Sequence, residues 1–156
     1  RNTETIAWAT LLGAILLYIS DQAPGDQRSL EEMTFTHAIL IGISQVFALI
    51  PGASRAGVTI TGARLCGYNR ADSARFSMLT AVPIVLAACI YNFLKIVREG
   101  QMELLGPVLL TATLAFATSL MAITGMMRWI HRASFTPFII YRLALGVTLL
   151  IWAYSN

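Results

Sequence analysis

The sequence has few charged residues. Only 12% of its 156 residues are Asp, Glu, Lys or Arg, and 56% are hydrophobic, whereas soluble domains carry about 25% charged residues. Its 11 basic residues are scattered singly, without the Lys- and Arg-rich runs that bind nucleic acid. The scarcity of charge therefore predicts a protein that lies in lipid, with no nucleic acid among its partners.

Cysteine and the common nucleotide motifs are also scarce or absent. Cys66 and Cys89 lie in apolar segments, lack metal-ligand spacing and are too few for a disulfide framework, so we interpret them as small buried apolar residues. No Gly-x-Gly-x-x-Gly or P-loop occurs, which leaves nucleotide chemistry without support. The first apolar stretch has no signal-peptide pattern and follows Arg1 without a methionine, so we expect upstream sequence.

Long hydrophobic runs are abundant. A bilayer-crossing helix needs about 20 apolar residues, and four runs qualify: residues 5–19, 73–96, 106–130 and 137–154. They predict an all-α integral membrane protein with about four transmembrane helices and one membrane domain over residues 1–156. Six arginines are assigned to the membrane interfaces, where long side chains reach the headgroups: Arg64, Arg70, Arg75, Arg128, Arg132 and Arg142.

One apolar run, residues 37–50, is too short to cross. At 1.5 Å per residue it reaches roughly 21 Å, against a hydrocarbon core of about 30 Å. Pro51 and Gly52 end it, and a second short helix is expected over residues 57–65. We predict a re-entrant helix hairpin over residues 37–66; the alternative is one kinked helix, which would place Arg55 inside a membrane helix at a cost of at least ~2.5 kcal/mol.

The segment between the two short helices, residues 51–57, has the features of an anion-binding turn. Gly52 and Gly57 allow a tight turn and close approach to a ligand. The second helix begins here, so its free N–H groups and positive dipole end face the turn. Arg55 adds a permanent charge and a planar fork that fits phosphate. Ser54 is also suited to cap the helix, and Thr59 to bond within it.

The order of several short motifs resembles one known family. The matching segments are Leu30-Glu31-Glu32-Met33-Thr34, Gly42-Ile43-Ser44-Gln45, Pro51-Gly52-Ala53-Ser54-Arg55-Ala56-Gly57, Arg75-Phe76-Ser77, Ala81-Val82-Pro83, and Ser134-Phe135-Thr136-Pro137-Phe138 with Tyr141-Arg142. From about Leu30 to its end, the chain is similar to the C-terminal half of the undecaprenyl-pyrophosphate phosphatase, or bacitracin-resistance, family. It departs from the family pattern at Ala56, where a serine is usual, and it lacks the family's N-terminal glutamate-rich motif.

The resemblance implies half of an inverted-repeat architecture, in which this chain supplies the cationic half of the active site and a missing N-terminal half supplies the acidic one. The implied reaction is hydrolysis of undecaprenyl pyrophosphate to undecaprenyl phosphate and inorganic phosphate in the bacterial plasma (inner) membrane. That reaction recycles the lipid carrier for peptidoglycan synthesis and confers bacitracin resistance. A divalent cation, Mg or Ca, is expected on the missing half, with no metal ligand in this chain; a homodimer is left open.

The resemblance also implies roles for particular residues. Arg55 and Ser54 are assigned to catalysis, with Arg55 holding the pyrophosphate. Contacts with the substrate are assigned to a second set: Gln45, Gly52, Ala53, Gly57 and Thr59. His37 and His131 lie at segment ends and receive no role.

Two other functions compete with hydrolysis. Discontinuous helices with a buried arginine also occur in transporters of anions, so half of a lipid-phosphate transporter or flippase is the alternative; a non-catalytic scaffold would leave Arg55 unexplained. The acid-phosphatase-like lipid phosphatases, by contrast, place a histidine six residues after a Ser-Arg pair. Here that position is Thr61, which excludes that class.

Overall fold

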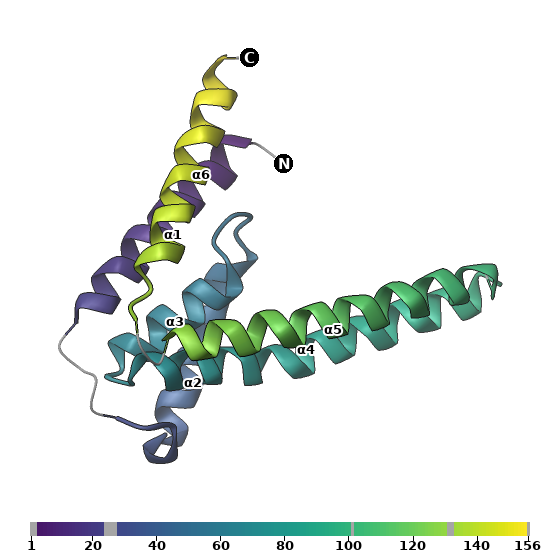
Figure 1. The fold of residues 1–156 in the computed structure, drawn as a ribbon, viewed down its shortest axis with the longest axis horizontal. Coiled ribbons are helices and arrows are strands. Elements are labelled where there is room, and N and C mark those ends of the chain that lie inside the picture. Colours follow the sequence, from purple (N-terminus) through teal and green to yellow (C-terminus); the bar gives the residue numbers. More distant parts are fainter. Residues whose placement is uncertain (1–2, 24–27, 101, 131–132, 156) are drawn as a thin grey trace. The chain divides into compact units, whose positions relative to one another are not determined.

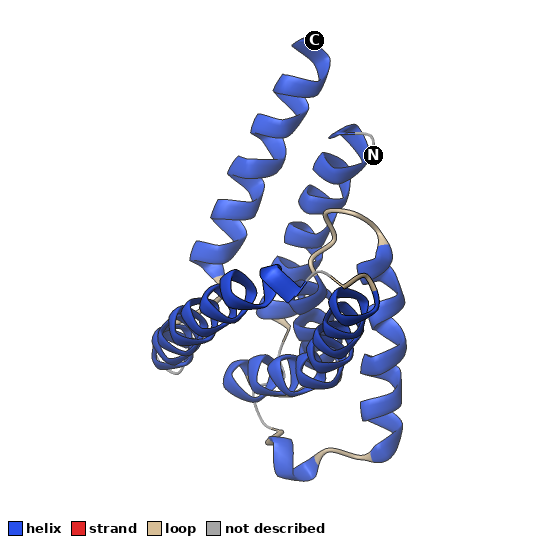
Figure 2. Ribbon diagram, turned by 90° about the vertical axis from the view of Figure 1, so that its right-hand side faces the viewer, coloured by secondary structure: helices blue, strands red, loops and turns tan. Residues whose placement is uncertain are grey.

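The computed structural model describes residues 3–23, 28–100, 102–130 and 133–155. Figure 2 shows helices joined by loops throughout this part of the chain, with no sheet strand. In chain order the elements are α1 (Thr3–Gln22), η1 (Leu30–Glu32), α2 (Phe35–Ser44), η2 (Gln45–Leu49), α3 (Arg55–Leu65), α4 (Arg70–Arg98), η3 (Met102–Leu104), α5 (Leu105–Ile130) and α6 (Thr136–Ser155). The all-α prediction is confirmed.

Among the described residues, four helices are long and apolar enough to cross a membrane. They are α1, α4, α5 with the preceding η3, and α6, and each contains one of the four predicted runs. The prediction of a multi-span membrane protein is therefore supported by helix length and composition.

The chain divides into two compact units. The first comprises Arg1–Met78 and Ile130–Asn156, and the second comprises Leu79–Trp129, so α4 begins in the first unit and continues in the second. The second unit consists of the rest of α4, η3 and nearly all of α5, and its side chains are mostly exposed. Cys89 is exposed there and Cys66 is half-buried, so the prediction that both are buried was wrong.

In the first unit, α1 and α6 lie side by side (Figure 1). Small side chains on α1 make this possible, because Ala7 and Ala14 are fully buried two turns apart. On α6, Gly146 allows the close approach of α1, since a Cβ atom at this position would lie 2.6 Å from the Leu11 side chain. The apolar run at the start of the chain is therefore helical and packs through its small residues.

The two short helices α2 and α3 pack against each other, with η2 between α2 and the turn. Ile41 of α2, Ala63 of α3 and Tyr68 form a small buried core. At the end of the helix pair opposite the turn, the Arg28 N–H donates to the Gly67 carbonyl at 3.3 Å, and the Asn69 N–H donates to the Arg28 carbonyl at 3.1 Å. The segments before α2 and after α3 therefore lie next to each other, and the chain reverses direction between the two helices. The alternative of one kinked helix is wrong.

Polar contacts fix both flanks of this helix pair. The Ser29 N–H donates to the Glu32 carboxylate at 3.0 Å, as part of a capping box at the start of η1. The Asp72 N–H donates to the Asn69 side-chain oxygen at 2.8 Å, which caps α4.

Arg64 is only 2% exposed, so its side chain does not extend out of the protein. Its guanidinium donates to the Tyr68 carbonyl at 2.8 Å and the Asp21 carbonyl at 3.1 Å, so it joins the end of α1 to the end of α3. Arg70 forms an ion pair of 2.6 Å with the buried Asp21 carboxylate. The prediction that the Arg64 side chain reaches out to lipid headgroups was wrong, because unpaired carbonyls at helix ends are available to it inside the protein.

Candidate anion-binding site

The turn before α3 has two residues with positive φ. Gly52 has φ of 97° and Ser54 has φ of 63°; the second value is rare for a residue with a side chain. Ser54 is the N-cap of α3, and its Oγ accepts a hydrogen bond of 3.3 Å from the Gly57 N–H. The N-cap role considered for Ser54 is confirmed, and its hydroxyl lies at the positive end of the α3 dipole.

Arg55 is the first residue of α3 and half-buried. Its Nη1 is buried, and in the described part of the protein it has no hydrogen-bond partner. A guanidinium nitrogen in that condition normally costs free energy, so an anion that accepts its hydrogen bond would remove the cost. This orphan donor at a helix N-terminus is the geometry expected of a phosphate site.

The other predicted contact residues are placed as follows. Thr59 is 1% exposed and its Oγ1 donates to the Arg55 carbonyl at 2.8 Å, so it bonds within its own helix as the alternative proposed. Ala53 is buried, and its N–H donates to the Ile50 carbonyl at 3.1 Å. Gln45 begins η2, which packs on α3. The turn gathers Gly52, Ala53, Ser54 and Arg55 within one short segment, and Gln45 lies on the neighbouring element.

Helix α1 supports the turn from one side. The Thr10 hydroxyl donates to the Gly52 carbonyl at 3.2 Å, and a Cβ atom on Gly52 would collide with the Ile6 carbonyl oxygen. Ile6 and Gly13, which both lie against the turn, are sixteen and nine residues from the end of α1 at Gln22, or about 24 Å and 14 Å at 1.5 Å per residue. The turn therefore lies at or past the middle of α1.

Arg142 of α6 is a site residue that the sequence analysis missed. Its Nη2 donates to the carbonyl oxygens of Ala53 at 3.0 Å and Gly52 at 3.3 Å, so its assignment to an interface was wrong. It lies six residues after the start of α6 at Thr136. The argument applied to Arg55, that a charge within an apolar helix needs a partner, would have found it.

An apolar cavity of about 210 Å³ borders the same turn. It is lined by α1, η2 and α3, with Leu16, Phe47 and Val58 among its walls, and Gly57 is shared with the turn. The site thus combines cationic and hydroxyl groups at a helix N-terminus with an adjoining apolar hollow.

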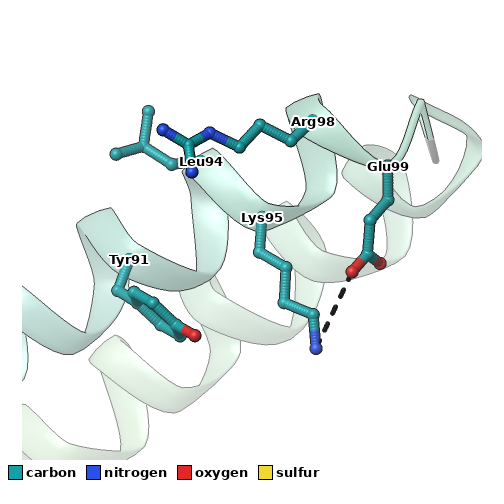
Figure 3. Close-up of a pocket in the computed structure, with 5 residues that line it drawn as sticks. All are labelled: Tyr91, Leu94, Lys95, Arg98 and Glu99. Carbon is teal, nitrogen blue, oxygen red and sulfur yellow. Dashed lines mark ion pairs between the residues drawn. The ribbon is translucent and has the colours of Figure 1, made fainter.

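A second hollow lies in the other unit, near the end of α4 (Figure 3). Tyr91, Lys95 and Arg98 line it, and the Lys95 ammonium is 3.9 Å from the Glu99 carboxylate. These side chains are exposed, and aromatic and basic residues are typical of helix ends at a membrane surface. We therefore regard the turn before α3 as the candidate functional site. His131 and Arg132 lie outside the described residues.

Over the described residues, fold and site together define an all-helical protein with four helices long and apolar enough to cross a membrane and a candidate anion-binding turn at a helix N-terminus. Residues 1–148 match the model of one family, the bacitracin resistance protein BacA. The chain belongs to this family.

Individual relatives carry a more specific name. The chain is 43% identical to an undecaprenyl-diphosphatase of Dinoroseobacter shibae over 99% of its length. It is 45% identical to one of Maricaulis maris over 97%, and 41% identical to undecaprenyl-diphosphatase 1 of Rhodospirillum rubrum over 96%. It spans 58%, 58% and 53% of those relatives, respectively.

Proposed function

We propose that this chain forms the C-terminal part of an undecaprenyl-diphosphatase. The enzyme would hydrolyse undecaprenyl pyrophosphate: water adds to the terminal phosphorus, the bond to the bridging oxygen breaks, and undecaprenyl phosphate and inorganic phosphate leave. The relatives that bear this name match nearly the whole chain. Release of the lipid carrier for cell-wall synthesis, and with it bacitracin resistance, belongs to the same proposal.

The observation that supports this function best is that Arg55, the first residue of α3, follows directly on the capping Ser54 and carries a guanidinium nitrogen that no described residue satisfies. The buried Nη1 of Arg55 has no partner among the described residues, and the Ser54 hydroxyl lies at the same helix end. Arg55 would hold the terminal phosphate and offset the charge that develops on it during transfer. The Ser54 hydroxyl would donate to a phosphate oxygen while its lone pair caps the helix.

The lipid part of the substrate requires an apolar path beside the phosphate site. The cavity next to Gly57 has that chemistry, since Leu16, Phe47 and Val58 are among its walls. We propose that it receives the isoprene units nearest the pyrophosphate.

The described part of the chain does not fit a divalent metal site. In it, no three His, Cys, Asp or Glu side chains gather where they could hold an ion, and the turn presents a guanidinium and a hydroxyl. We propose that the expected Mg or Ca ion is bound by carboxylates of the N-terminal part that the longer relatives have. The role of this chain is then to bind and orient the pyrophosphate.

The helix pair α2 and α3 is proposed to enter and leave the membrane from one side. The hydrogen bonds between Arg28 and the Gly67–Asn69 segment hold its two ends together, and the turn lies about 14 to 24 Å along α1 from that end. A multi-span protein of the bacterial plasma membrane, built as an inverted repeat with a second hairpin in the missing part, would bring an acidic motif to this depth.

The test is phosphate release from farnesyl pyrophosphate, a short prenyl pyrophosphate, by the full-length protein in detergent. Arg55→Ala is expected to abolish release, and Arg55→Lys to restore it only in part, because an ammonium lacks the planar fork. Arg98→Ala, an exposed arginine of α4, is the control and is expected to remain active. If Arg55→Ala keeps more than about a tenth of the activity, a barrier change of only ~1.4 kcal/mol, the proposal fails.

The same assay separates hydrolysis from transport. Detergent micelles have no second compartment, so a lipid-phosphate transporter or flippase would release no phosphate from farnesyl pyrophosphate. Activity in micelles supports the phosphatase, and its absence in a folded protein supports the transporter.

A further inference from the structure

Arg142 has more hydrogen-bonding capacity than its contacts use. It is permanently charged and lies within α6, an apolar helix long enough to span a membrane. Its Nη2 donates to two neutral carbonyl oxygens, those of Gly52 and Ala53. These bonds hold the turn in place, but both acceptors are neutral, so neither bond offsets the positive charge of the guanidinium.

The other terminal nitrogen, Nη1 of Arg142, is buried and has no hydrogen-bond partner in the part of the protein that the structure describes. Arg55 has a buried Nη1 in the same condition. The turn therefore has two arginines, one from α3 and one from α6, each with a donor that the described residues do not satisfy. Leaving one such donor unsatisfied is costly, and two at one turn point to a ligand with several acceptor oxygens.

Two glycines make room for the Arg142 guanidinium. A Cβ atom on Gly57 of α3 would collide with Arg142 Nη1, and one on Gly13 of α1 would lie 2.6 Å from Arg142 Nη2. The guanidinium thus lies between α1 and α3, against the backbone of both. The sequence predicted that Gly57 lets a ligand approach closely. In the structure, the Arg142 guanidinium occupies the space beside Gly57 instead.

The position of Gly57 also locates Nη1 relative to the serine. The same added Cβ atom would lie 3.4 Å from Ser54 Oγ, so the unsatisfied nitrogen of Arg142 and the Ser54 hydroxyl both lie close to one point at the start of α3. A phosphate bound by the α3 N-terminus and Ser54 would be within reach of Arg142.

From this geometry we propose that Arg142 is a second binding residue for the pyrophosphate, and that it positions the turn at the same time. The inference rests on the proposed function. A pyrophosphate has two phosphate groups and more negative charge than one guanidinium can offset. Arg55 contacts one phosphate, Arg142 Nη1 contacts the other, and the Nη2 bonds to Gly52 and Ala53 keep the turn at a fixed distance from α6.

The experiment compares variants of the full-length protein in detergent. For each, kcat and KM for farnesyl pyrophosphate are measured, together with the rise in unfolding temperature that inorganic pyrophosphate produces. Arg142→Ala is expected to raise KM about tenfold to a hundredfold, as loss of a charge-assisted hydrogen bond does, and to remove most of the pyrophosphate-induced rise. Arg142→Lys is expected to recover only part of the KM effect and of the pyrophosphate-induced rise, because an ammonium cannot donate to the turn and to the ligand in one plane.

Gly57→Ala tests the same contact without removing the arginine. Its methyl group displaces the guanidinium, so Gly57→Ala is expected to raise KM, as Arg142→Ala does. The double variant Gly57→Ala with Arg142→Ala is expected to have a KM no higher than that of Arg142→Ala alone. Arg28→Ala is the matched control, since Arg28 also donates from its guanidinium to a backbone carbonyl, that of Cys66 at 3.0 Å, but at the other end of the helix pair. It is expected to keep the wild-type KM.

Three outcomes overturn the inference. If Arg142→Ala matches Arg28→Ala in KM and in the response to pyrophosphate, Arg142 does not bind substrate. If Arg142→Ala only lowers the unfolding temperature and keeps the wild-type KM and pyrophosphate response, it merely supports the turn. If the wild-type protein neither hydrolyses farnesyl pyrophosphate nor is stabilised by pyrophosphate, the proposed function fails first and the binding role with it.

Discussion

Ser54 combines an unusual backbone conformation with a helix cap. Its φ of 63° lies where residues with a Cβ atom are strained, yet its hydroxyl accepts from the Gly57 N–H. Glycine would relieve the strain but has no hydroxyl to place at the proposed phosphate site. Strain of this kind is typical of sites where a side chain must point in a fixed direction.

We therefore predict different stabilities for two substitutions at Ser54. Ser54→Ala keeps the strain and loses the cap, so it is expected to destabilise by about 1 kcal/mol. Ser54→Gly loses only a few tenths at the cap and gains from relieved strain, so it should be about 1–2 kcal/mol more stable than Ser54→Ala. Thermal unfolding in detergent measures both; equal stabilities would show that the backbone at position 54 is unstrained. Phosphate release should fall in both variants.

The sequence predicts residue roles where the partner is local and misses them where the partner is distant. The Ser54 cap and the internal bond of Thr59 connect residues three or four apart, and helix rules cover such pairs. Arg142 bonds to residues 89 and 90 positions away, and Arg64 bonds to a carbonyl 43 positions away. Which arginine reaches which carbonyl depends on tertiary packing, and helix periodicity does not contain that information.

At the scale of elements, the close contact between the turn and α1 depends on one glycine. Gly52 has positive φ, and a Cβ atom there would lie 2.9 Å from the Ile6 Cα as well as against its carbonyl. Both obstacles are backbone, so neither can move away as a flexible side chain could. Gly42 of α2, by contrast, has open space around its Cα.

This contrast predicts opposite effects for two glycine substitutions. Gly52→Ala is expected to destabilise by at least about 2 kcal/mol, from backbone strain together with overpacking. Gly42→Ala should be neutral or stabilise by up to about 1 kcal/mol, because alanine favours the helix. Unfolding of the two variants in detergent provides the comparison. A tolerated Gly52→Ala would mean that the turn does not contact α1 closely.

The sequence predicted the two short helices well, because the ends of a helix depend on signals from residues near it in the sequence. The length of the apolar run over residues 37–50 and the Pro51-Gly52 pair indicated two short helices, and the structure has α2 with η2, then α3. The sequence did not indicate that η2 would be a 3-10 helix, nor that the turn would lie against Ile6 and Thr10 of α1. Those features depend on the fit between elements.

At the scale of the whole molecule, the turn receives basic groups from two helices, Arg55 of α3 and Arg142 of α6. In the described residues, carboxylates such as Asp21 and Glu32 are bonded to other groups away from the turn. The relatives are longer than this chain, and our proposal places the acidic part of the site in that additional length.

The 156-residue chain by itself is therefore expected to release no phosphate from farnesyl pyrophosphate. It lacks, in its described part, a cluster of acidic or metal-binding side chains, and the role proposed for Arg55 and Arg142 is only to bind the anion. Purified chain and full-length protein are compared in the same detergent with the same assay. Measurable hydrolysis by the chain alone would show that its own residues suffice and that we have misplaced the chemistry.

The last prediction concerns the side of the membrane on which the helix pair opens. The hydrogen bonds between Arg28 and the Gly67–Asn69 segment bring the two ends of the helix pair together, so we expect both ends on one side of the membrane. If α4 and α5 each cross, the loops with Arg28, Arg70, Arg75, Arg128 and Arg132 share that side, and Arg1, Lys95 and Arg98 are on the other. Five basic residues against three favour the first side as cytoplasmic; of these, Arg1 and Arg132 lie outside the described residues.

Single cysteines at exposed positions test this orientation. Glu31→Cys lies before α2 and Glu103→Cys lies in η3; both are made with Cys66 and Cys89 replaced, because these two thiols would otherwise compete for the label. With a membrane-impermeant thiol reagent on intact cells, we expect labelling at position 103 and protection at position 31, and labelling of both after permeabilisation. Gln27 and Gln101, which belong to the same two connections, lie outside the described residues. The reverse labelling pattern would place the two joined ends of the helix pair outside the cell. The proposed phosphate site would then face the cytoplasm, because the turn lies at least half the length of α1 away from those ends.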